Sequence, residues 1–347
     1  MKNLYIQTAF LGDLLLALPV LRQIRYWDSK SSLTVLCRKG YGSLLEKLEV
    51  CDEVVELDKG DKLKARKILQ KDNYKTIFCA HQSWSTHQLV KALKADIKIG
   101  YRRFWNKGYF DRRVKRCLVW PEVIRQMQLL EPMDQSLTLK LEAFSQDPLG
   151  LPAWSQMKNN SSVFRDSDIQ SLLQKKVGTQ KLTHPLVCLA PGSVWPTKRW
   201  TKSGFMQVGL ALNRKGYQVA LLGASNERSL CEELHNEIPN SLMLAGHLNI
   251  FESLMILSRA KGLICNDSGA MHLASLLNLP TLALFGPTVQ ELGYKPWNPN
   301  AQVIERKGLL CRPCGQHGAI NCPIGTHICM SGIDPMDVFD RALILFS

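Results

Sequence analysis

The sequence predicts an α/β protein made of two similar halves, each a parallel sheet covered by helices. Apolar strand-like runs alternate with helical stretches, and such a βαβα rhythm is typical of a parallel sheet. The rhythm breaks over residues 145–180, where Pro148, Gly150, Pro152 and the run 159–162 (Asn-Asn-Ser-Ser) indicate a linker. With 347 residues, the chain is long enough to form two separate cores.

The first half is predicted to begin with a strand and to alternate regularly from there. Short apolar runs indicate its strands, and the helix over 62–70 is rich in charged residues. We expect strands over 3–10, 32–38, 52–57 and 74–80, and helices over 13–26, 41–48 and 62–70.

A second set of elements begins after the break, and two such halves are expected to enclose a cleft. The last helix ends the chain and can cross back to the first half. We expect strands over 186–191, 217–223, 262–265 and 280–285, and helices over 202–214, 227–237, 250–260 and 335–346.

The most informative local pattern follows the strand over 262–265. This apolar run stops at Asn266, and a helical pattern begins after Asp267, Ser268 and Gly269. Asp267 or Ser268 can cap that helix, and Gly269 lets a ligand approach the backbone closely. Free N–H groups and the positive dipole end there bind anions, most often phosphate, at the sheet edge where α/β proteins bind nucleotides. A helix cap followed by a turn explains the pattern equally well.

The charge of the chain points to a polyanionic partner. The formal net charge is +14, although the hydrophobic content of 45% and the charged content of 21% are ordinary. Nucleic acid, an acidic membrane surface or a phosphorylated glycolipid would fit this charge, and a well-solvated basic surface is the alternative.

The location of the protein is predicted to be the cytoplasm. No stretch approaches the run of about 18 apolar residues that a transmembrane helix needs. Residues 1–25 resemble a signal peptide only weakly, because Asp13 interrupts the apolar run and no cleavage site follows. Scattered cysteines in apolar runs indicate a reducing compartment; they are Cys37, Cys51, Cys79, Cys117, Cys188, Cys231 and Cys265.

Three motifs in order resemble one known family. The first is Gly12-Asp13 with the Leu-rich stretch up to Arg22, and the second runs from Ala190 to Trp200 (APGSVWPTKRW). The third combines Asp267-Ser268-Gly269 and His272 with the stretch 280–288. Together they make the chain similar to the bacterial ADP-heptose:lipopolysaccharide heptosyltransferases of glycosyltransferase family 9, and to heptosyltransferase II-like members among them.

The resemblance implies a GT-B fold, with two Rossmann-like domains whose parallel sheets face a central cleft. Residues 1–165 would bind the acceptor, residues 180–330 would bind the nucleotide sugar, and a C-terminal helix over 331–347 could pack back on the first domain. The implied reaction is an inverting transfer of heptose from ADP-heptose to the inner core of lipopolysaccharide, on a Kdo or heptose acceptor attached to lipid A. It implies no cofactor and no metal.

Two other functions stay open. A related glycosyltransferase could use another nucleotide sugar. A zinc-stabilised nucleic-acid-binding protein would leave Asp13 and the Asp267-Ser268-Gly269 run without a role, so no nucleic-acid partner is expected.

The family assigns roles to matching residues of this chain. Asp13 matches the catalytic base, although a helix cap is its alternative role. Ser193 and Lys198 match residues that hold phosphate, while Val194 replaces a position that is often Thr. Backbone N–H groups of Ser268 and Gly269 can supply the missing donor.

Further donor contacts are expected on the same half. Asp267 matches the residue that holds heptose hydroxyls, and His272 lies just over one helical turn beyond it. A purely structural role is the alternative for His272. Beside the ribose, Ser225 matches best by spacing and Glu227 is the better hydroxyl acceptor. The backbone of Leu248 is expected to meet adenine.

The segment 101–116 combines basic and aromatic residues. Guanidinium groups suit phosphate and carboxylate, and aromatic rings suit a membrane interface. We expect this segment to bind an anionic lipopolysaccharide core and to contact the inner membrane peripherally, on its cytoplasmic face; a solvated loop is the alternative. The expected acceptor residues are Arg102, Arg103, Arg112 and Arg113.

A group of cysteines near the end of the chain has metal-like spacing. Cys311 and Cys314 form a CxxC pair, and His317 and His327 lie nearby. The remaining cysteines, Cys322 and Cys329, do not form the second close pair of a zinc ribbon. A structural zinc and a reduced loop both stay open.

Overall fold

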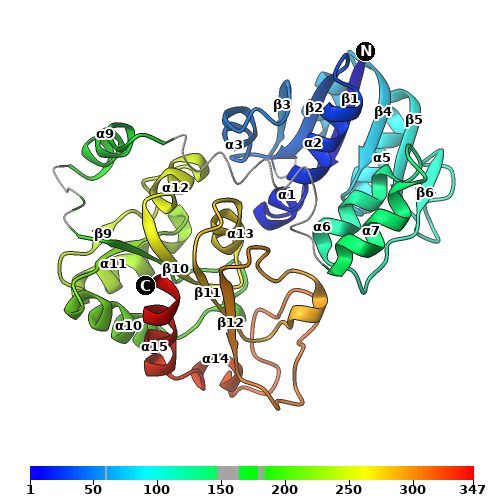
Figure 1. Cartoon of the computed structure of the whole chain (residues 1–347). Helices are drawn as coiled ribbons and strands as arrows, with labels where there is room; N and C mark the ends of the chain where they lie inside the picture. Colours follow the sequence, from blue (N-terminus) through cyan, green and yellow to red (C-terminus); the bar gives the residue numbers. More distant parts are fainter. Residues whose placement is uncertain (59–60, 147–163, 179–181, 183) are drawn as a thin grey trace. The chain divides into compact units, whose positions relative to one another are not determined.

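The computed structural model describes residues 1–58, 61–146, 164–178, 182 and 184–347 (Figure 1). The chain divides into two compact units, Met1–Gln156 and Met157–Ser347. The predicted linker signals at Pro148, Gly150, Pro152 and 159–162 lie outside the described residues.

The first unit holds a six-stranded sheet whose neighbouring strands all run parallel, in the order β3-β2-β1-β4-β5-β6. Its strands are β1 Lys2–Gln7, β2 Ser32–Arg38, β3 Glu53–Leu57, β4 Asn73–Cys79, β5 Lys94–Tyr101 and β6 Arg112–Val114. Its helices are α1 Leu11–Leu15, α2 Leu18–Trp27, α3 Gly42–Lys47, α4 Lys62–Leu69, α5 Trp84–Ala92, α6 Glu122–Met127 and α7 Leu137–Gln146, with the 3-10 turn η1 Gln128–Leu130.

The central strands are apolar because helices cover both faces of a parallel sheet. In β1 every residue from Asn3 to Gln7 is buried. The expected helix over 13–26 is in fact two helices, α1 and α2. Pro19 lies in the first turn of α2, where its missing N–H costs nothing, whereas inside one long helix it would remove a hydrogen bond.

The second unit repeats this sheet, again with parallel neighbours, in the order β12-β11-β10-β7-β8-β9. Its strands are β7 Leu186–Ala190, β8 Gln218–Leu221, β9 Leu242–Met243, β10 Ala260–Asn266, β11 Thr281–Phe285 and β12 Ala301–Glu305. Its helices are α9 Asp166–Val177, α10 Lys202–Arg214, α11 Arg228–Glu237, α12 Ile250–Leu257, α13 Gly269–Leu276, α14 Ile328–Ser331 and α15 Pro335–Phe346, with the 3-10 turns η4 Pro196–Lys198, η5 Ser225–Glu227 and η6 Gln290–Leu292.

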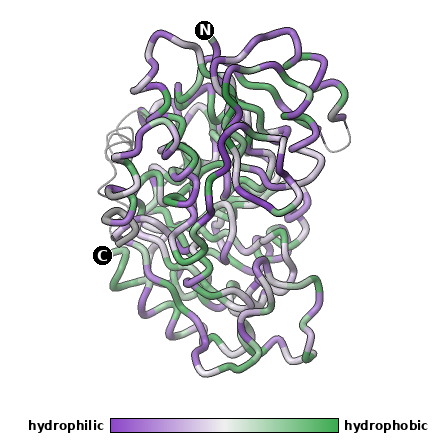
Figure 2. Tube along the Cα trace, turned by 90° about the vertical axis from the view of Figure 1, so that its right-hand side faces the viewer, coloured by the Kyte–Doolittle hydropathy of each residue, from purple (hydrophilic) through white to green (hydrophobic). Residues whose placement is uncertain are grey.

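Each unit has its own hydrophobic core. In Figure 2 hydrophobic stretches lie inside each unit, and hydrophilic stretches lie on its outer turns. Side chains of β7, β8, β10 and β11 form the second core together with residues of α10, α11 and α15. Among the described residues, no helix has the length and apolar character needed to span a membrane.

The C-terminal helix α15 belongs to the second unit, where it packs against α10, β10 and β11. It buries Val338, Phe339, Ala342 and Phe346 in the core there. The apolar face of this helix is thus part of the core of the second unit. A Cβ atom on Gly262 would lie 2.1 Å from the Phe346 ring, so the helix docks where β10 has no side chain.

Both sheets have the strand order of a doubly wound Rossmann fold, 3-2-1-4-5-6 in chain order. The order reverses between β1 and β4 in the first unit, and between β7 and β10 in the second. Ligands of such sheets bind at the carboxyl ends of the strands that flank this reversal. We therefore expect the ligand-binding residues of each unit at these two edges.

Candidate functional site

The second unit carries a polar cluster where β7 and β10 end. Buried Asn266, the last residue of β10, ties the two loops together. Its Nδ2 donates to the carbonyl oxygens of Pro191 (2.8 Å) and Gly192 (3.3 Å), and its Oδ1 accepts from the Trp200 backbone N–H (2.9 Å). This amide fixes the loop that carries Ser193 and Lys198, a role that the sequence alone did not indicate.

Asp267 is the centre of this cluster, with only 7% of its surface exposed. Lys198 Nζ donates to its Oδ2 at 2.6 Å, and Thr288 Oγ1 donates to the same oxygen at 2.7 Å. Ser193 Oγ donates to its backbone carbonyl at 3.3 Å. Two of the predicted donor-site residues, Ser193 and Lys198, therefore contact a third, Asp267. Thr288 was not assigned a role from the sequence, although its place after β11 indicated the same sheet edge.

Helix α13 begins beside this carboxylate. Ser268 occupies its N-cap position, but its side chain makes no capping bond, so the expected cap is present only in the backbone. Its Oγ is buried and has no hydrogen-bond partner among the residues that the structure describes. Gly269 starts the helix. The helix dipole and this hydroxyl together favour an anion or a sugar hydroxyl here.

His272 lies on the first turn of α13 and is buried. Burial lowers the pKa of its imidazole to about 4; nearby Asp267 opposes this fall, and Lys198 adds to it. The ring is therefore neutral at physiological pH. Its Nδ1 has no hydrogen-bond partner within the described part of the chain.

The expected nucleoside residues lie on loops beside this cluster. Ser225 is exposed and Glu227 is half-buried, with its Oε2 accepting from the Ala224 backbone N–H at 2.8 Å. A Cβ atom on Gly192 would lie 2.0 Å from Glu227 Oε1, so a side chain at this position would displace the Glu227 carboxylate. Leu248 is half-buried in the loop before α12.

The segment after β12 supports both donors to Asp267. Arg312 donates to the carbonyl oxygen of Thr288 and to the Glu305 carboxylate, each at 2.8 Å. On the other loop, Thr197 Oγ1 accepts from the Ala319 backbone N–H at 3.0 Å, and a ring nitrogen of His327 lies 2.7 Å from the Thr197 carbonyl oxygen. This segment therefore holds the residues next to Lys198 and the backbone of Thr288.

The cysteines with metal-like spacing lie in this same segment. Cys314 Sγ contacts the carbonyl oxygen of Cys311 at 3.2 Å, and the backbone N–H of His327 donates to Cys322 Sγ at 3.4 Å. Cys329 is buried. In the described ranges, no group of three or more His, Cys, Asp or Glu side chains is arranged to hold a metal ion.

In the first unit, Asp13 lies on α1, just after the carboxyl end of β1. It is half-buried, and its Oδ2 accepts from the Phe10 backbone N–H at 3.2 Å. Its backbone carbonyl accepts from Gln126 Nε2 at 2.8 Å, while Gln126 Oε1 accepts from Tyr5 and Gln7. The carboxylate thus holds the start of α1 from the third position of the helix, whereas the N-cap residue is Phe10, and buried Gln126 fixes the Asp13 backbone.

Two further polar groups lie near this edge. Thr8 Oγ1 is 2.8 Å from His81 Nδ1, which joins the loops after β1 and β4. Buried Glu122 forms ion pairs with Arg116 and Arg125. Burial raises the pKa of Glu122, the two arginines oppose this rise, and Asp13 adds to it. The charge of Asp13 therefore acts on the buried Glu122 and its two arginine partners, which the sequence motifs did not indicate.

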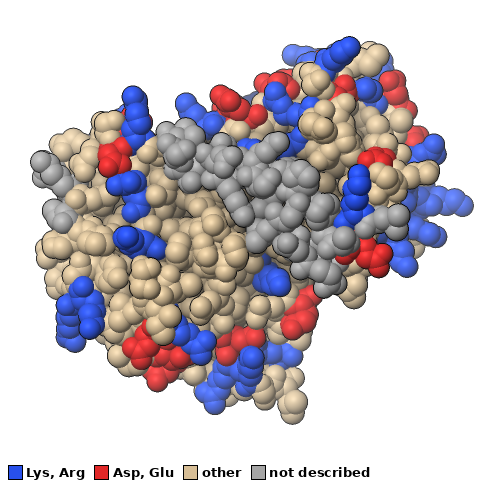
Figure 3. Space-filling model, viewed as in Figure 1, with Lys and Arg blue, Asp and Glu red and all other residues tan. Residues whose placement is uncertain are grey.

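The four predicted acceptor arginines all lie in the first unit, around its edge strand β6. Arg102 and Arg103 follow β5, and the Arg102 backbone N–H donates to the Val114 carbonyl oxygen at 2.7 Å. Arg112 and Arg113 are in β6 itself. Arg113 is half-buried and the other three are exposed. Lysine and arginine side chains gather over this edge in Figure 3.

Comparison with known proteins decides the family. The sequence model of "Glycosyltransferase family 9 (heptosyltransferase)" matches residues 62–323, well over half of the chain. The chain belongs to glycosyltransferase family 9. The predicted family and enzyme class are therefore confirmed.

Relatives and solved structures agree with this family 9 membership. The chain is 34% identical over 110 residues to lipooligosaccharide heptosyltransferase 2 of Haemophilus influenzae, covering 30% of this chain and 32% of that protein. It is 23% identical over 322 residues to lipopolysaccharide heptosyltransferase 2 of Escherichia coli K12, covering 88% of both. The structure of E. coli ADP-heptose lps heptosyltransferase II matches with a TM-score of 0.80 at 21% identity, over 100% of this chain and 98% of that one. The GT-B fold class is thereby confirmed for this family 9 enzyme.

Proposed function

We propose that this family 9 glycosyltransferase transfers heptose from ADP-heptose to the inner core of lipopolysaccharide, on a Kdo or heptose acceptor attached to lipid A. One observation carries the donor side of this proposal. Lys198 and Thr288 converge on Asp267 at the β7–β10 edge, beside the N-terminus of α13. A cation, a carboxylate and free backbone donors at a Rossmann edge suit a diphosphate joined to a sugar.

The reaction is a single displacement with inversion. An acceptor hydroxyl oxygen attacks the anomeric carbon, the bond from that carbon to the diphosphate oxygen breaks, and ADP leaves. Asp13 takes the hydroxyl proton as general base, a role typically worth 10² to 10⁴ in rate. Lys198, Ser193 and the first N–H groups of α13 stabilise the charge that develops on the leaving diphosphate.

The remaining residues orient the substrates. Asp267 receives both of its side-chain donors on Oδ2, so its Oδ1 is the oxygen we assign to a heptose hydroxyl. Neutral His272 supports that contact without adding charge. Glu227 or Ser225 binds the ribose, and the backbone of Leu248 meets adenine. No metal or cofactor takes part.

The acceptor side uses the basic edge of the first unit. Arg102, Arg103, Arg112 and Arg113 bind the anionic core sugars and phosphates, because guanidinium pairs well with carboxylate and phosphate. We place the enzyme in the cytoplasm, bound peripherally to the cytoplasmic face of the inner membrane.

Calorimetric titration with a panel of nucleotide sugars tests the donor assignment. We expect ADP-heptose to bind at least tenfold more tightly than ADP-glucose, UDP-glucose or GDP-mannose, roughly 1.4 kcal/mol. Tighter binding of another nucleotide sugar would instead make the chain a related glycosyltransferase with a different donor.

A further inference from the structure

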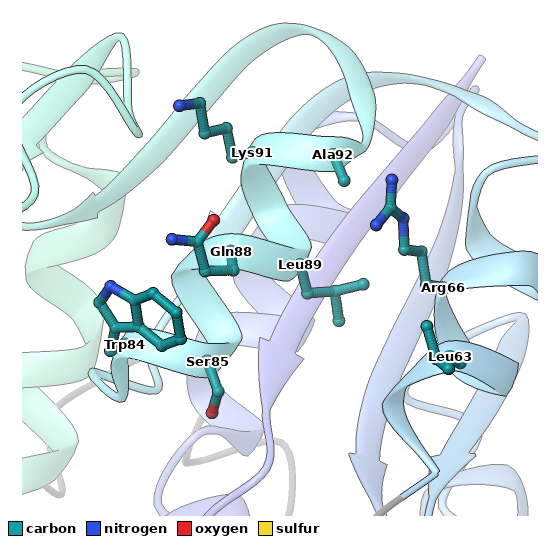
Figure 4. A pocket seen from close by; sticks show the side chains of 8 residues that line it. All are labelled: Leu63, Arg66, Trp84, Ser85, Gln88, Leu89, Lys91 and Ala92. Carbon is teal, nitrogen blue, oxygen red and sulfur yellow. The ribbon is translucent and has the colours of Figure 1, made fainter.

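A groove of ≈560 Å³ lies between helices α4 and α5 of the first unit, away from the residues assigned above (Figure 4). Leu63 and Arg66 line it from α4, and Trp84, Leu89 and Lys91 line it from α5. In Figure 4 the side chains of Leu63 and Arg66 lie across the groove from Leu89. None of the proposed catalytic, donor or acceptor residues contributes to its lining.

The apolar part of this groove is unusually exposed. Leu63 exposes 71% of its surface and Trp84 exposes 62%, whereas Leu89 at 6% forms the floor. Single exposed apolar residues are common, but a leucine and a tryptophan that flank one groove make a patch that a partner can cover. Tryptophan is also the side chain most suited to a membrane–water interface, because its ring is apolar and its N–H is polar.

The charged residues that line the groove are basic. Arg66 and Lys91 line it, and Lys64 and Lys67 are exposed on the same helix α4. Among the described residues that line the groove, none is acidic. Lys91 Nζ lies 5.5 Å from the ring centroid of Tyr109, so the groove adjoins the basic segment 101–116. A surface with apolar anchors and several cations is complementary to an anionic lipid surface.

The position of the groove fits this partner. Helices α4 and α5 begin just after β3 and β4, so Leu63 and Trp84 lie near the carboxyl edge of the sheet, where Asp13 also lies. An acceptor whose lipid stays in the membrane must be reached from that edge.

We infer that the α4–α5 groove docks the enzyme on an anionic phospholipid bilayer, with Leu63 and Trp84 entering the interface and Arg66 and Lys91 meeting headgroup phosphates. The inference rests on the proposed function only in that the acceptor is a membrane lipid. It adds a binding surface separate from the four acceptor arginines.

Flotation of the full-length enzyme with lipid vesicles tests this inference. Vesicles of phosphatidylcholine are compared with vesicles of phosphatidylcholine and phosphatidylglycerol, without any acceptor. Arg66→Gln/Lys91→Gln should lower affinity for the anionic vesicles about thirtyfold, roughly fivefold for each cation near the surface. Leu63→Ser/Trp84→Ser should lower affinity for both kinds of vesicle.

Matched controls come from the second unit. Lys202→Gln/Arg341→Gln removes two exposed cations, and Ile344→Ser removes an apolar side chain that is 75% exposed. The controls should bind like the wild type.

Fluorescence quenching tests whether Trp84 enters the bilayer. Bromine-labelled lipids should quench part of the enzyme's fluorescence, and Trp84→Phe should remove that part. If the groove variants bind vesicles like the wild type, or if Trp84→Phe leaves the quenching unchanged, the inference is wrong. It is also wrong if these variants bind vesicles normally but raise KM for a delipidated core sugar, because the groove would then bind sugar. Vesicle binding needs no donor, so its failure would leave the proposed transfer activity standing.

Discussion

At the scale of single residues, the chemistry of the proposed donor site depends on one buried carboxylate and the charge that balances it. The pair Lys198–Asp267 has its Nζ and Oδ2 atoms 2.6 Å apart, with 11% and 7% of the two side chains exposed. Because both charges are largely removed from water, removing either one leaves the other uncompensated. The pair therefore has to be considered together.

Replacing the lysine should weaken nucleotide binding. Lys198→Ala removes a charge-assisted donor worth roughly 1.5–3 kcal/mol and leaves the Asp267 carboxylate close to the diphosphate. We expect the Kd for ADP and ADP-heptose to rise at least about tenfold in calorimetric titrations. Lys202→Ala is a matched control, because that lysine is exposed and pairs with Glu233. If both Kd and turnover stay at wild-type values in Lys198→Ala, the phosphate assignment fails.

Asp13 should affect turnover and not donor binding. Asp13→Asn keeps the size of the side chain and an oxygen that can accept from the Phe10 backbone N–H, so the start of α1 should survive. Without a base, kcat should fall at least about a hundredfold, while the Kd for ADP-heptose stays within about twofold. Steady-state kinetics with a core acceptor measure this. Near-normal turnover would leave Asp13 with only its capping role.

At the scale of elements, the motif-bearing loops were predicted well and the supporting segments were not. Apolar runs predicted β1, β7 and β10, because a central parallel strand is buried on both faces. The strand β6 carries two arginines in three residues, so its sequence has no apolar signal. Asn266, Gln126 and Arg312 hold the motif-bearing loops through backbone carbonyls, and no local pattern indicates such long-range bonds.

A buried histidine of α5, packed against aromatic rings from the segment after β5, predicts a pH dependence of stability. His87 is buried, with its ring 4.8 Å from the rings of Trp105 and Phe110, and burial lowers its pKa from 6.5 to about 4. Its neutral form is favoured in the folded state. The stability it contributes is therefore complete above about pH 6.5 and is lost as the pH falls toward 4.

Replacing this ring should flatten the stability curve. Each pKa unit corresponds to about 1.4 kcal/mol, so His87 costs up to about 3 kcal/mol of stability by pH 4. In His87→Phe, the free energy of unfolding should be at least equal to that of the wild type at pH 7, and should fall less between pH 6.5 and 4. Chemical denaturation at several pH values measures this. An equally steep fall in the variant would show that the ring is not held neutral. Part of the fall in the free energy of unfolding should remain in both the wild type and His87→Phe, because burial also lowers the pKa of His272 to about 4.

At the scale of the whole molecule, we propose that the two Rossmann sheets bind different substrates. The second unit binds the donor, and the first unit, whose basic edge contributes to the net charge of +14, binds the anionic acceptor. The alternating rhythm of the sequence was enough to predict two α/β halves, and the structure gives both the same strand order. The C-terminal helix was predicted at its observed bounds, Pro335–Phe346, but its docking against Gly262 of β10 has no signal within the helix sequence.

The basic edge of the first unit should govern the acceptor alone. Neutral replacements, Arg102→Gln, Arg103→Gln and Arg112→Gln, should raise the acceptor KM, and added salt should reduce the difference from wild type because these side chains are exposed. Donor affinity should hardly change. A delipidated, dephosphorylated core sugar is the control. If the variants lose as much activity on that sugar as on the charged glycolipid, the arginines stabilise the fold and do not bind the acceptor's anionic groups.

The most direct measurement is acceptor-dependent transfer from ADP-heptose, followed by NMR of the product. The purified enzyme is incubated with ADP-heptose and a series of truncated lipopolysaccharide cores. We predict that ADP is released only with an inner-core acceptor, and that the new linkage has the anomeric configuration opposite to that of the donor. Transfer with retained configuration, or no transfer to any inner-core acceptor while another sugar nucleotide supports turnover, would contradict the proposed function.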